Sequence, residues 1–203
     1  MERVYVLPAS AFPPAGDGLM PLEPGLLKKI EREGFFLERT QAEEDPSYRQ
    51  VIPYALVRYG DRYLLMRRKG GNEARLRGLY TLGVGGHINP EDQGVNPLLD
   101  GLRRELLEEV GVRRYTARPM GLIVMSDTPV SRVHAGVVFL VDSEDQPQVA
   151  EPEKLEGWLA TPEEVHAVYD RLEGWSQVVV DRLRGQQGLE GAGSPWHASG
   201  SAG

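Results

Sequence analysis

The sequence predicts a domain of the α/β class, in which strands of a sheet are packed against helices. Short apolar runs bounded by glycine and proline are typical of strands, and one long amphipathic segment, Asn96–Val110, is typical of a helix. The chain has 203 residues, of which 40% are hydrophobic and 26% charged, as expected of a globular protein with a sizeable core.

The charge and the cysteine count limit the classes of function. A formal net charge of −7 argues against general nucleic-acid binding, because proteins that bind its backbone present excess lysine and arginine. A small phosphorylated substrate is compatible with this charge, since a divalent cation supplies positive charge locally. The absence of cysteine excludes disulfides, thiolate metal sites and cysteine catalysis.

No apolar segment has the length of a membrane anchor. The longest wholly apolar stretch near the middle, Val137–Val141, is far shorter than a bilayer-spanning helix. Near the N-terminus, Val4–Leu7 is too short for the apolar part of a signal peptide, and Pro8 follows it. We therefore expect a cytoplasmic protein with no membrane partner.

Composition divides the chain into three parts. Residues 1–50 are predicted to be an N-terminal accessory segment, residues 51–184 the main domain, and residues 185–203 a flexible C-terminal tail rich in glycine, serine and alanine. The accessory segment contains a predicted strand, Val4–Leu7, and a predicted helix, Leu26–Glu33. The accessory segment and the C-terminal helices either cover the substrate or build a homodimer.

The main domain contains a series of predicted strands, followed by helices. Gly60 and Asp61 separate the first two strands, which predicts a hairpin. Thr161 suits a helix N-cap, and Ser176–Arg184 suits a helix, although its three valines also suit a strand. The predicted strands are Val51–Tyr59, Tyr63–Met66, Leu79–Val84, Met120–Met125 and Val133–Val141.

The segment Asn96–Val110 carries both helix-boundary signals and an apolar face. Asn96 suits the N-cap, Pro97 the first helical position, and Gly111 the residue after the helix. At about 100° per residue, one set of side chains forms an apolar stripe that faces a sheet. These side chains are Leu99, Leu102, Leu106 and Val110.

Three glutamates of this helix lie on one side of it. Glu105, Glu108 and Glu109 are spaced i, i+3 and i+4, so their carboxylates repel one another and also oppose the helix dipole. A solvated acidic face is one explanation. The other is a site for Mg²⁺ or Mn²⁺, which prefer clustered oxygen ligands. Arg104, one turn before Glu108, is placed to hold that side chain.

The surrounding residues resemble the Nudix box. Arg104–Val112, with the letters RELLEEVGV, matches the second half of the family pattern at every specified position. In the first half of the family pattern, five residues separate a glycine from a glutamate, whereas here five residues separate Gly86 from Asp92. The loop Asn89–Val95 is then about four residues longer than usual. Asp92 or Glu91 is the candidate to replace the family glutamate, which pairs with the box arginine.

The resemblance covers roughly Val51–Val168 and implies a fold and a chemistry. The fold is an α/β/α sandwich with a mixed sheet. The implied metal ligands for Mg²⁺ or Mn²⁺ are Glu105, Glu108, Glu109 and the Gly85 carbonyl, and the implied catalytic residues are Glu105, Glu108 and Arg104. Glu105 is the first choice for the general base. The alternatives on a later loop are Glu151, Glu153 and Glu156.

The implied substrate is a nucleotide-like diphosphate, and the run Gly83–Asp92 resembles the predicted-phosphoesterase branch of MutT-like Nudix proteins. Arg67 and Arg68, with weaker support for Arg75 and Arg77, are candidates for phosphate contacts. Gly86 and Glu156 are further candidates for substrate binding. The glycines Gly83, Gly85 and Gly86 lack the P-loop pattern and predict a tight turn near the metal.

Several aromatic side chains are candidates for either a structural or a binding role. Histidines His87, His134 and His166 lack metal-ligand spacing, which favours structural roles. The side chains of Tyr54, Trp158 and Trp175 either stack on a base or belong to the core.

Three functions compete. The first is metal-dependent hydrolysis of a diphosphate linkage in a nucleoside diphosphate derivative. The second is a Nudix-fold binding or regulatory module without catalysis, although such modules often lose the box glutamates that this chain retains. The third is an enzyme similar to isopentenyl diphosphate isomerase, which is disfavoured because those enzymes use a cysteine that this chain lacks.

Overall fold

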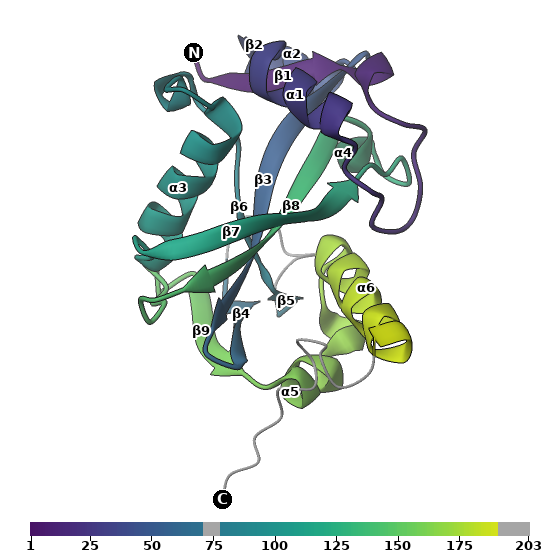
Figure 1. The fold of residues 1–203 in the computed structure, drawn as a ribbon. Coiled ribbons are helices and arrows are strands. Elements are labelled where there is room, and N and C mark those ends of the chain that lie inside the picture. Colours follow the sequence, from purple (N-terminus) through teal and green to yellow (C-terminus); the bar gives the residue numbers. More distant parts are fainter. Residues whose placement is uncertain (71–77, 191–203) are drawn as a thin grey trace, which may run out of the picture.

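The computed structural model describes residues 1–70 and 78–190, the last five by their backbone alone. Arg75 and Arg77 therefore lie outside the described residues. Figure 1 shows a central sheet with helix α3 on one side and helix α6 on the other. The strands are β1 Arg3–Pro8, β2 Phe35–Glu38, β3 Tyr48–Tyr59, β4 Arg62–Arg68, β5 Tyr80–Thr81, β6 Gly83–Gly85, β7 Tyr115–Ile123, β8 His134–Ser143 and β9 Leu155–Ala160. The helices are α1 Pro24–Arg32, α2 Arg39–Glu44, α3 Pro97–Val110, α4 Pro129–Arg132, α5 Pro162–Ala167 and α6 Gly174–Glu190, with short 3₁₀ turns at Ala9–Ala11, Pro90–Asp92 and Tyr169–Arg171.

Strand β3 is the centre of a mixed sheet. It runs parallel to β8 from Gln50 to Arg58, and antiparallel to β1, β4 and β6. Strand β7 continues the sheet beyond β8, and β9 continues it beyond β4. The α/β class and the mixed sheet that the sequence predicted are confirmed.

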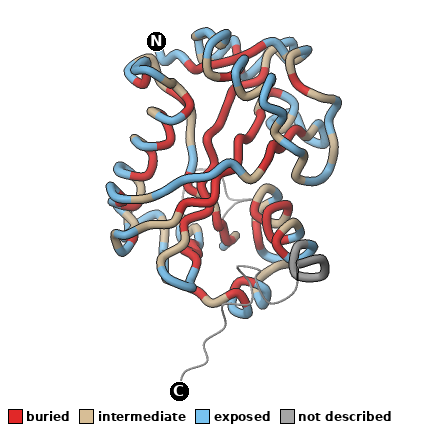
Figure 2. Tube along the Cα trace, in the orientation of Figure 1, coloured by how far each residue is buried: buried red, intermediate tan, exposed pale blue. Residues whose placement is uncertain are grey.

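Both faces of this sheet are buried, as Figure 2 shows by the red central strands. Along β3, Ala55 and Val57 belong to the core beneath α3, whereas Tyr54 and Leu56 belong to the core beneath α6. This alternation follows from the period of two in a strand, and its burial on both sides requires helices on both faces. The predicted α/β/α sandwich is thereby confirmed.

The boundaries of several predicted elements differ in the structure. The hairpin at Gly60-Asp61 is confirmed by β3 and β4. The single predicted strand Leu79–Val84 is instead two short strands, β5 and β6, interrupted at Leu82. The segment Ser176–Arg184 is helical, within α6.

The first fifty residues are part of the same sheet. Strand β1 pairs with β3, and β2 pairs with β1, so the accessory segment extends the sheet at its edge. Leu7 and Ile30 are buried in the core beneath α3. Helix α6 continues to Glu190, so the predicted tail begins later than residue 185, and residues 191–203 lie outside the described part. Among the described helices, none is long and apolar enough to cross a membrane.

Candidate active site

Helix α3 begins and ends at the predicted residues. The Asn96 side chain accepts a hydrogen bond from the backbone N–H of Leu99 at 3.2 Å, and Gly111 adopts the left-handed conformation with φ of 66°. The predicted apolar stripe is wrong at one position: Leu99 is 44% exposed, and Leu98 is buried instead. Leu98 fits because it continues the four-residue spacing of Leu102 and Leu106 toward the helix start.

Arg104 connects the helix to the loop that precedes it. Its Nη2 donates to the backbone carbonyl of His87 at 2.8 Å. Its Nη1 donates to Glu105 Oε1 at 2.9 Å and to Glu108 Oε2 at 3.1 Å. The contact with Glu108 that the sequence predicted is therefore present, and one guanidinium nitrogen joins two of the three box carboxylates.

Asp92, a candidate to replace the family glutamate, pairs with Arg104. Its carboxylate accepts hydrogen bonds from Arg104 Nε at 3.0 Å and from Arg104 Nη2 at 3.1 Å, and it is 5% exposed. The same carboxylate accepts the backbone N–H of Asn89 at 2.8 Å, which closes the short 3₁₀ turn. Glu91, the other candidate, is exposed. The extra residues of the loop thus form a turn that returns an acid to Arg104.

Glu105 is the buried member of the glutamate cluster, with 8% exposure. A Cβ atom on Gly86 would lie 2.4 Å from Glu105 Oε1, so the carboxylate rests directly on the glycine backbone. Burial raises the pKa of Glu105, Arg104 opposes the rise, and the neighbouring charges of Glu109 and Glu108 add to it. Burial lowers the pKa of Arg104, but its bonds with Asp92 and the charge of Glu105 leave that pKa raised overall.

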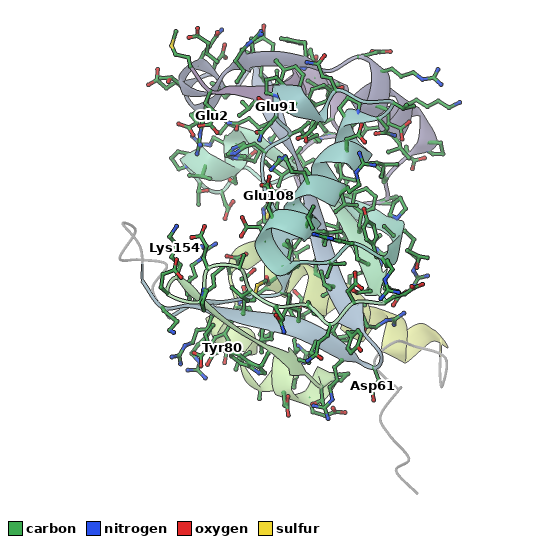
Figure 3. All side chains as sticks on the ribbon, turned by 90° about the vertical axis from the view of Figure 1, so that its left-hand side faces the viewer. Glu2, Asp61, Tyr80, Glu91, Glu108 and Lys154 are labelled. Carbon is green, nitrogen blue, oxygen red and sulfur yellow. The ribbon has the colours of Figure 1, made fainter. Side chains whose placement is uncertain are left out.

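Glu108 and Glu109 lie one turn further along α3. Glu108 is exposed and Glu109 is half-buried. Figure 3 shows Glu108 projecting from the side of α3, between Glu91 above and Lys154 below. Across residues 1–70 and 78–190, no three histidine or acidic side chains already converge in a metal-binding arrangement. Arg104 is the group that balances Glu105 and Glu108 in this conformation.

The glycine cluster forms a strand and not the predicted tight turn. Gly83 and Gly85 belong to β6, which pairs with Leu56 and Tyr54 of β3, and no left-handed φ occurs there. Glycine is needed for close approach: a Cβ on Gly83 would overlap the Tyr54 ring at 1.8 Å, and one on Gly85 would lie 2.4 Å from the Pro53 carbonyl. At Gly83 and Gly85 the backbone of β6 is therefore packed too tightly for a side chain.

The predicted phosphate-binding arginines lie on β4. Arg67 faces Glu156 across the β4–β9 pair, with an exposed ion pair of 3.4 Å. Arg68 lies 3.7 Å from Glu173, and its buried Nε has no hydrogen-bond partner. The structure gives neither arginine a contact with the box glutamates. Of the later-loop base candidates, Glu151 forms an ion pair with Lys154, and Glu153 is exposed.

A polar network at the start of α6 was not evident from the sequence. The fully buried Ser176 hydroxyl accepts the backbone N–H of Leu82 at 2.9 Å and lies 2.8 Å from the Tyr54 hydroxyl. Glu173 accepts the Thr81 hydroxyl at 2.7 Å. These bonds tie α6 to the interruption between β5 and β6. Hydroxyls at these positions carry no sequence signal, since their partners are distant in the chain.

The aromatic candidates belong mainly to the core. Tyr54 and Trp175 make an edge-to-face contact at 5.4 Å, and Tyr80 and Trp158 make another at 5.9 Å. Trp158 is 36% exposed, so part of its ring remains at the surface.

Comparisons with known proteins identify the family. A family model described as the NUDIX domain matches residues 49–183. The chain belongs to the Nudix family. Protein YmaB from Bacillus subtilis (strain 168) is 34% identical over 170 residues, covering 78% of this chain and 82% of that protein. The crystal structure of Tm1382, which is assigned as a Nudix hydrolase, matches this chain with a TM-score of 0.76 and 35% sequence identity. The match covers 91% of this chain and all of that one.

A more distant structure shares the fold of this chain. DR0079 from Deinococcus radiodurans has a TM-score of 0.51 and 20% identity, covering 72% of this chain and 90% of that one. Family membership and the similarity to Tm1382 show that the present protein is a Nudix hydrolase. They favour the enzyme over the two rival functions, the binding module and the isomerase.

Proposed function

We propose that this Nudix hydrolase cleaves a diphosphate linkage in a nucleoside diphosphate derivative, with Mg²⁺ or Mn²⁺ as cofactor. The observation that carries the proposal is the Glu105 carboxylate, buried against Gly86 and flanked by Glu108 and Glu109 on the same helix. A cluster of like charges, one of them buried, is unfavourable unless cations compensate for it, and such perturbed groups gather at functional sites.

The residues fit a hard divalent cation. Glu105, Glu108, Glu109 and the Gly85 carbonyl supply only oxygen donors, the kind that Mg²⁺ and Mn²⁺ prefer. When bound, the metal polarises the phosphoryl oxygens and stabilises the charge that develops on the leaving phosphate. The cytosolic location proposed for the chain is compatible with the absence of cysteine.

Glu105 is the group that we assign as general base. A carboxylate accepts a proton more readily when its pKa is raised toward neutrality, and burial raises the pKa of Glu105. Arg104 holds one carboxylate oxygen of Glu105 through Nη1 and is itself fixed by Asp92. Arg104 therefore orients Glu105, so that its other oxygen can receive a proton from the attacking water.

Glu108→Gln tests the proposal. Release of phosphate-containing products from a panel of nucleoside diphosphate derivatives is measured with Mg²⁺. The substitution removes the charge of a proposed metal ligand, so turnover should fall by roughly 10²-fold or more. It keeps an oxygen that accepts the hydrogen bond from Arg104. Mg²⁺ should raise the melting temperature of the wild type and not that of the variant.

The control is Glu163→Gln, which removes an exposed glutamate from α5. It should keep wild-type turnover and the wild-type response to Mg²⁺. Unchanged turnover in the Glu108 variant would overturn the assigned roles.

A further inference from the structure

The loop between β8 and β9 lies against the turn of α3 that carries Glu108 and Glu109. In this loop, the backbone N–H of Ala150 donates to the Glu109 carbonyl at 2.9 Å. Lys154, four residues further along, lies on the same side of the molecule as Glu108 and below it (Figure 3). The loop therefore brings a basic side chain to the end of the glutamate cluster.

Backbone hydrogen bonds fix the position from which the Lys154 side chain extends. The N–H groups of Lys154 and Leu155 both donate to the Glu151 carbonyl at 3.0 Å, which closes a turn. The N–H of Lys69, at the end of β4, donates to the Lys154 carbonyl at 2.9 Å. The Lys69 Nζ donates to the Pro152 carbonyl of the same turn at 3.0 Å. The turn is thus held to the helix at one end and to the sheet at the other.

The Lys154 ammonium lies among acidic side chains. It forms an ion pair with Glu151, three residues earlier in the chain. This bond raises the pKa of Lys154, and the charges of Glu153 and Glu109 add to the rise. Lys154 is therefore positively charged at pH 7, and its charge acts on Glu109, one of the proposed metal ligands.

The pair of Lys154 with Glu151 can exchange for another anion. The two side chains are 64% and 46% exposed, and water screens ion pairs as exposed as this one, so they contribute little to stability. A divalent cation at the α3 glutamates would neutralise much of the negative charge nearby. A phosphate, which carries more charge than a carboxylate, could then compete with Glu151 for the ammonium.

The arginines of β4 are placed differently. Arg67 pairs with Glu156 across the β4–β9 pair, and Arg68 lies near Glu173 at the start of α6. Lys154, by contrast, extends from a loop whose backbone is bonded to Glu109 itself. A lysine ammonium on a flexible stem can also follow a phosphate without a fixed geometry.

We propose that Lys154 binds a phosphate of the diphosphate substrate, and that Glu151 occupies its ammonium until Mg²⁺ and substrate are bound. Lys154 is then a substrate-binding residue, and Glu151 is a competitor that lowers the affinity for phosphate. The inference rests on the proposed function, because it concerns the same substrate beside the same metal.

The test measures the binding of imidodiphosphate, a diphosphate analogue whose bridging N–H resists hydrolysis, by calorimetric titration with Mg²⁺. Lys154→Gln should weaken the binding about tenfold, because it removes a charged donor to the phosphate. It should not weaken the binding of Mg²⁺ alone, since Lys154 is not a metal ligand. Lys154→Arg keeps the charge and should keep most of the wild-type affinity for imidodiphosphate.

Glu151→Gln should have the opposite effect. It releases the ammonium, so imidodiphosphate should bind about threefold more tightly. The gain should vanish when Glu151→Gln is combined with Lys154→Gln, because it depends on the freed lysine. The controls are Lys28→Gln in α1 and Glu163→Gln in α5, both at exposed positions, and both should keep the wild-type affinity.

Wild-type affinity for imidodiphosphate in Lys154→Gln would overturn the inference. A gain in Glu151→Gln that persists in the double variant would also overturn it, since the loss of one negative charge would then explain the effect without Lys154. Failure to hydrolyse any nucleotide with Mg²⁺ would instead reject the proposed function, and it is detected separately by product release.

Discussion

Asp92 accepts three hydrogen bonds from Arg104, two from Nε and one from Nη2, at 3.0 to 3.2 Å. The two residues are separated by a loop longer than the family pattern, yet the short 3₁₀ turn Pro90–Asp92 returns the acid to the arginine. The chain thereby keeps the acid–arginine pair with a shorter side chain on a longer loop. The position of Glu105 depends on it, since Arg104 also holds that carboxylate.

Asp92→Asn should lower the free energy of unfolding by about 1.5–3 kcal/mol, because it weakens charge-assisted hydrogen bonds at a buried site. Urea denaturation measures this loss. Turnover should fall as well, since Arg104 would no longer be fixed. Glu91→Gln, at the exposed neighbour, should change the free energy of unfolding by less than about 0.5 kcal/mol. Equal effects of the two substitutions would show that the pairing with Arg104 contributes nothing.

Gly86→Ala should impair catalysis more than it impairs the fold. The new Cβ would lie 2.4 Å from Glu105 Oε1 and 2.8 Å from its carboxyl carbon, so the side chain must move. We expect a loss of about 1–3 kcal/mol in the free energy of unfolding, typical of overpacking, and a fall in kcat from the displaced base.

The matched control is Gly25→Ala in α1, where a Cβ meets nothing within 4 Å. It should stabilise the protein by about 0.5–1 kcal/mol, because alanine favours a helix, and should leave kcat unchanged. Wild-type kcat in Gly86→Ala would contradict the role of the glycine as the support of Glu105.

Local signals in the sequence predicted the helix, the hairpin and the acid–arginine pair. Asn96 and Gly111 mark the ends of α3 because caps act through neighbouring backbone groups. Asp92 and Glu91 were the two candidates for the pairing with Arg104. In the structure Asp92 makes this pair, because its carboxylate also closes the turn with Asn89. Such features depend on residues a few positions apart, which is the range that sequence patterns report.

Features that depend on distant residues were not predictable in the same way. The buried face of α3 includes Leu98 and not Leu99, because packing against the sheet fixes the rotation of the helix about its axis. The glycines of β6 were assigned to a turn, yet Tyr54 and Pro53 of a neighbouring strand are what exclude a side chain there. The unpaired amide of Gln50 is likewise evident only from burial.

Acidification should destabilise the protein through His87. The pKa of His87 in the folded protein is about 4, below the usual 6.5. The unfolded chain therefore binds the proton more tightly than the folded protein does. The stability that this contributes is fully present above pH 6.5 and is lost as the pH falls toward 4. The groups around His87 are His134, Arg39, Glu2 and Glu43.

The free energy of unfolding, measured at pH 7 and pH 5, tests this effect. His87→Gln cannot titrate, so its free energy of unfolding should fall less between the two pH values than that of the wild type. His166→Gln, at an exposed histidine of α5, should fall as much as the wild type. The same fall in all three proteins would mean that His87 does not titrate abnormally.

Ser176→Ala should destabilise the interruption between β5 and β6. The substitution leaves the N–H of Leu82 without its acceptor, and leaves the Tyr54 hydroxyl with Glu173 at 3.5 Å. An unpaired buried donor costs about 1–3 kcal/mol, and urea denaturation should show a loss of that size. Ser10→Ala, at an exposed serine near the N-terminus, should be neutral. Because Gly83–Gly85 follows directly after Leu82, KM for a nucleotide substrate should also rise in Ser176→Ala. A loss of stability with an unchanged KM would mean that the network stabilises the fold but does not support substrate binding.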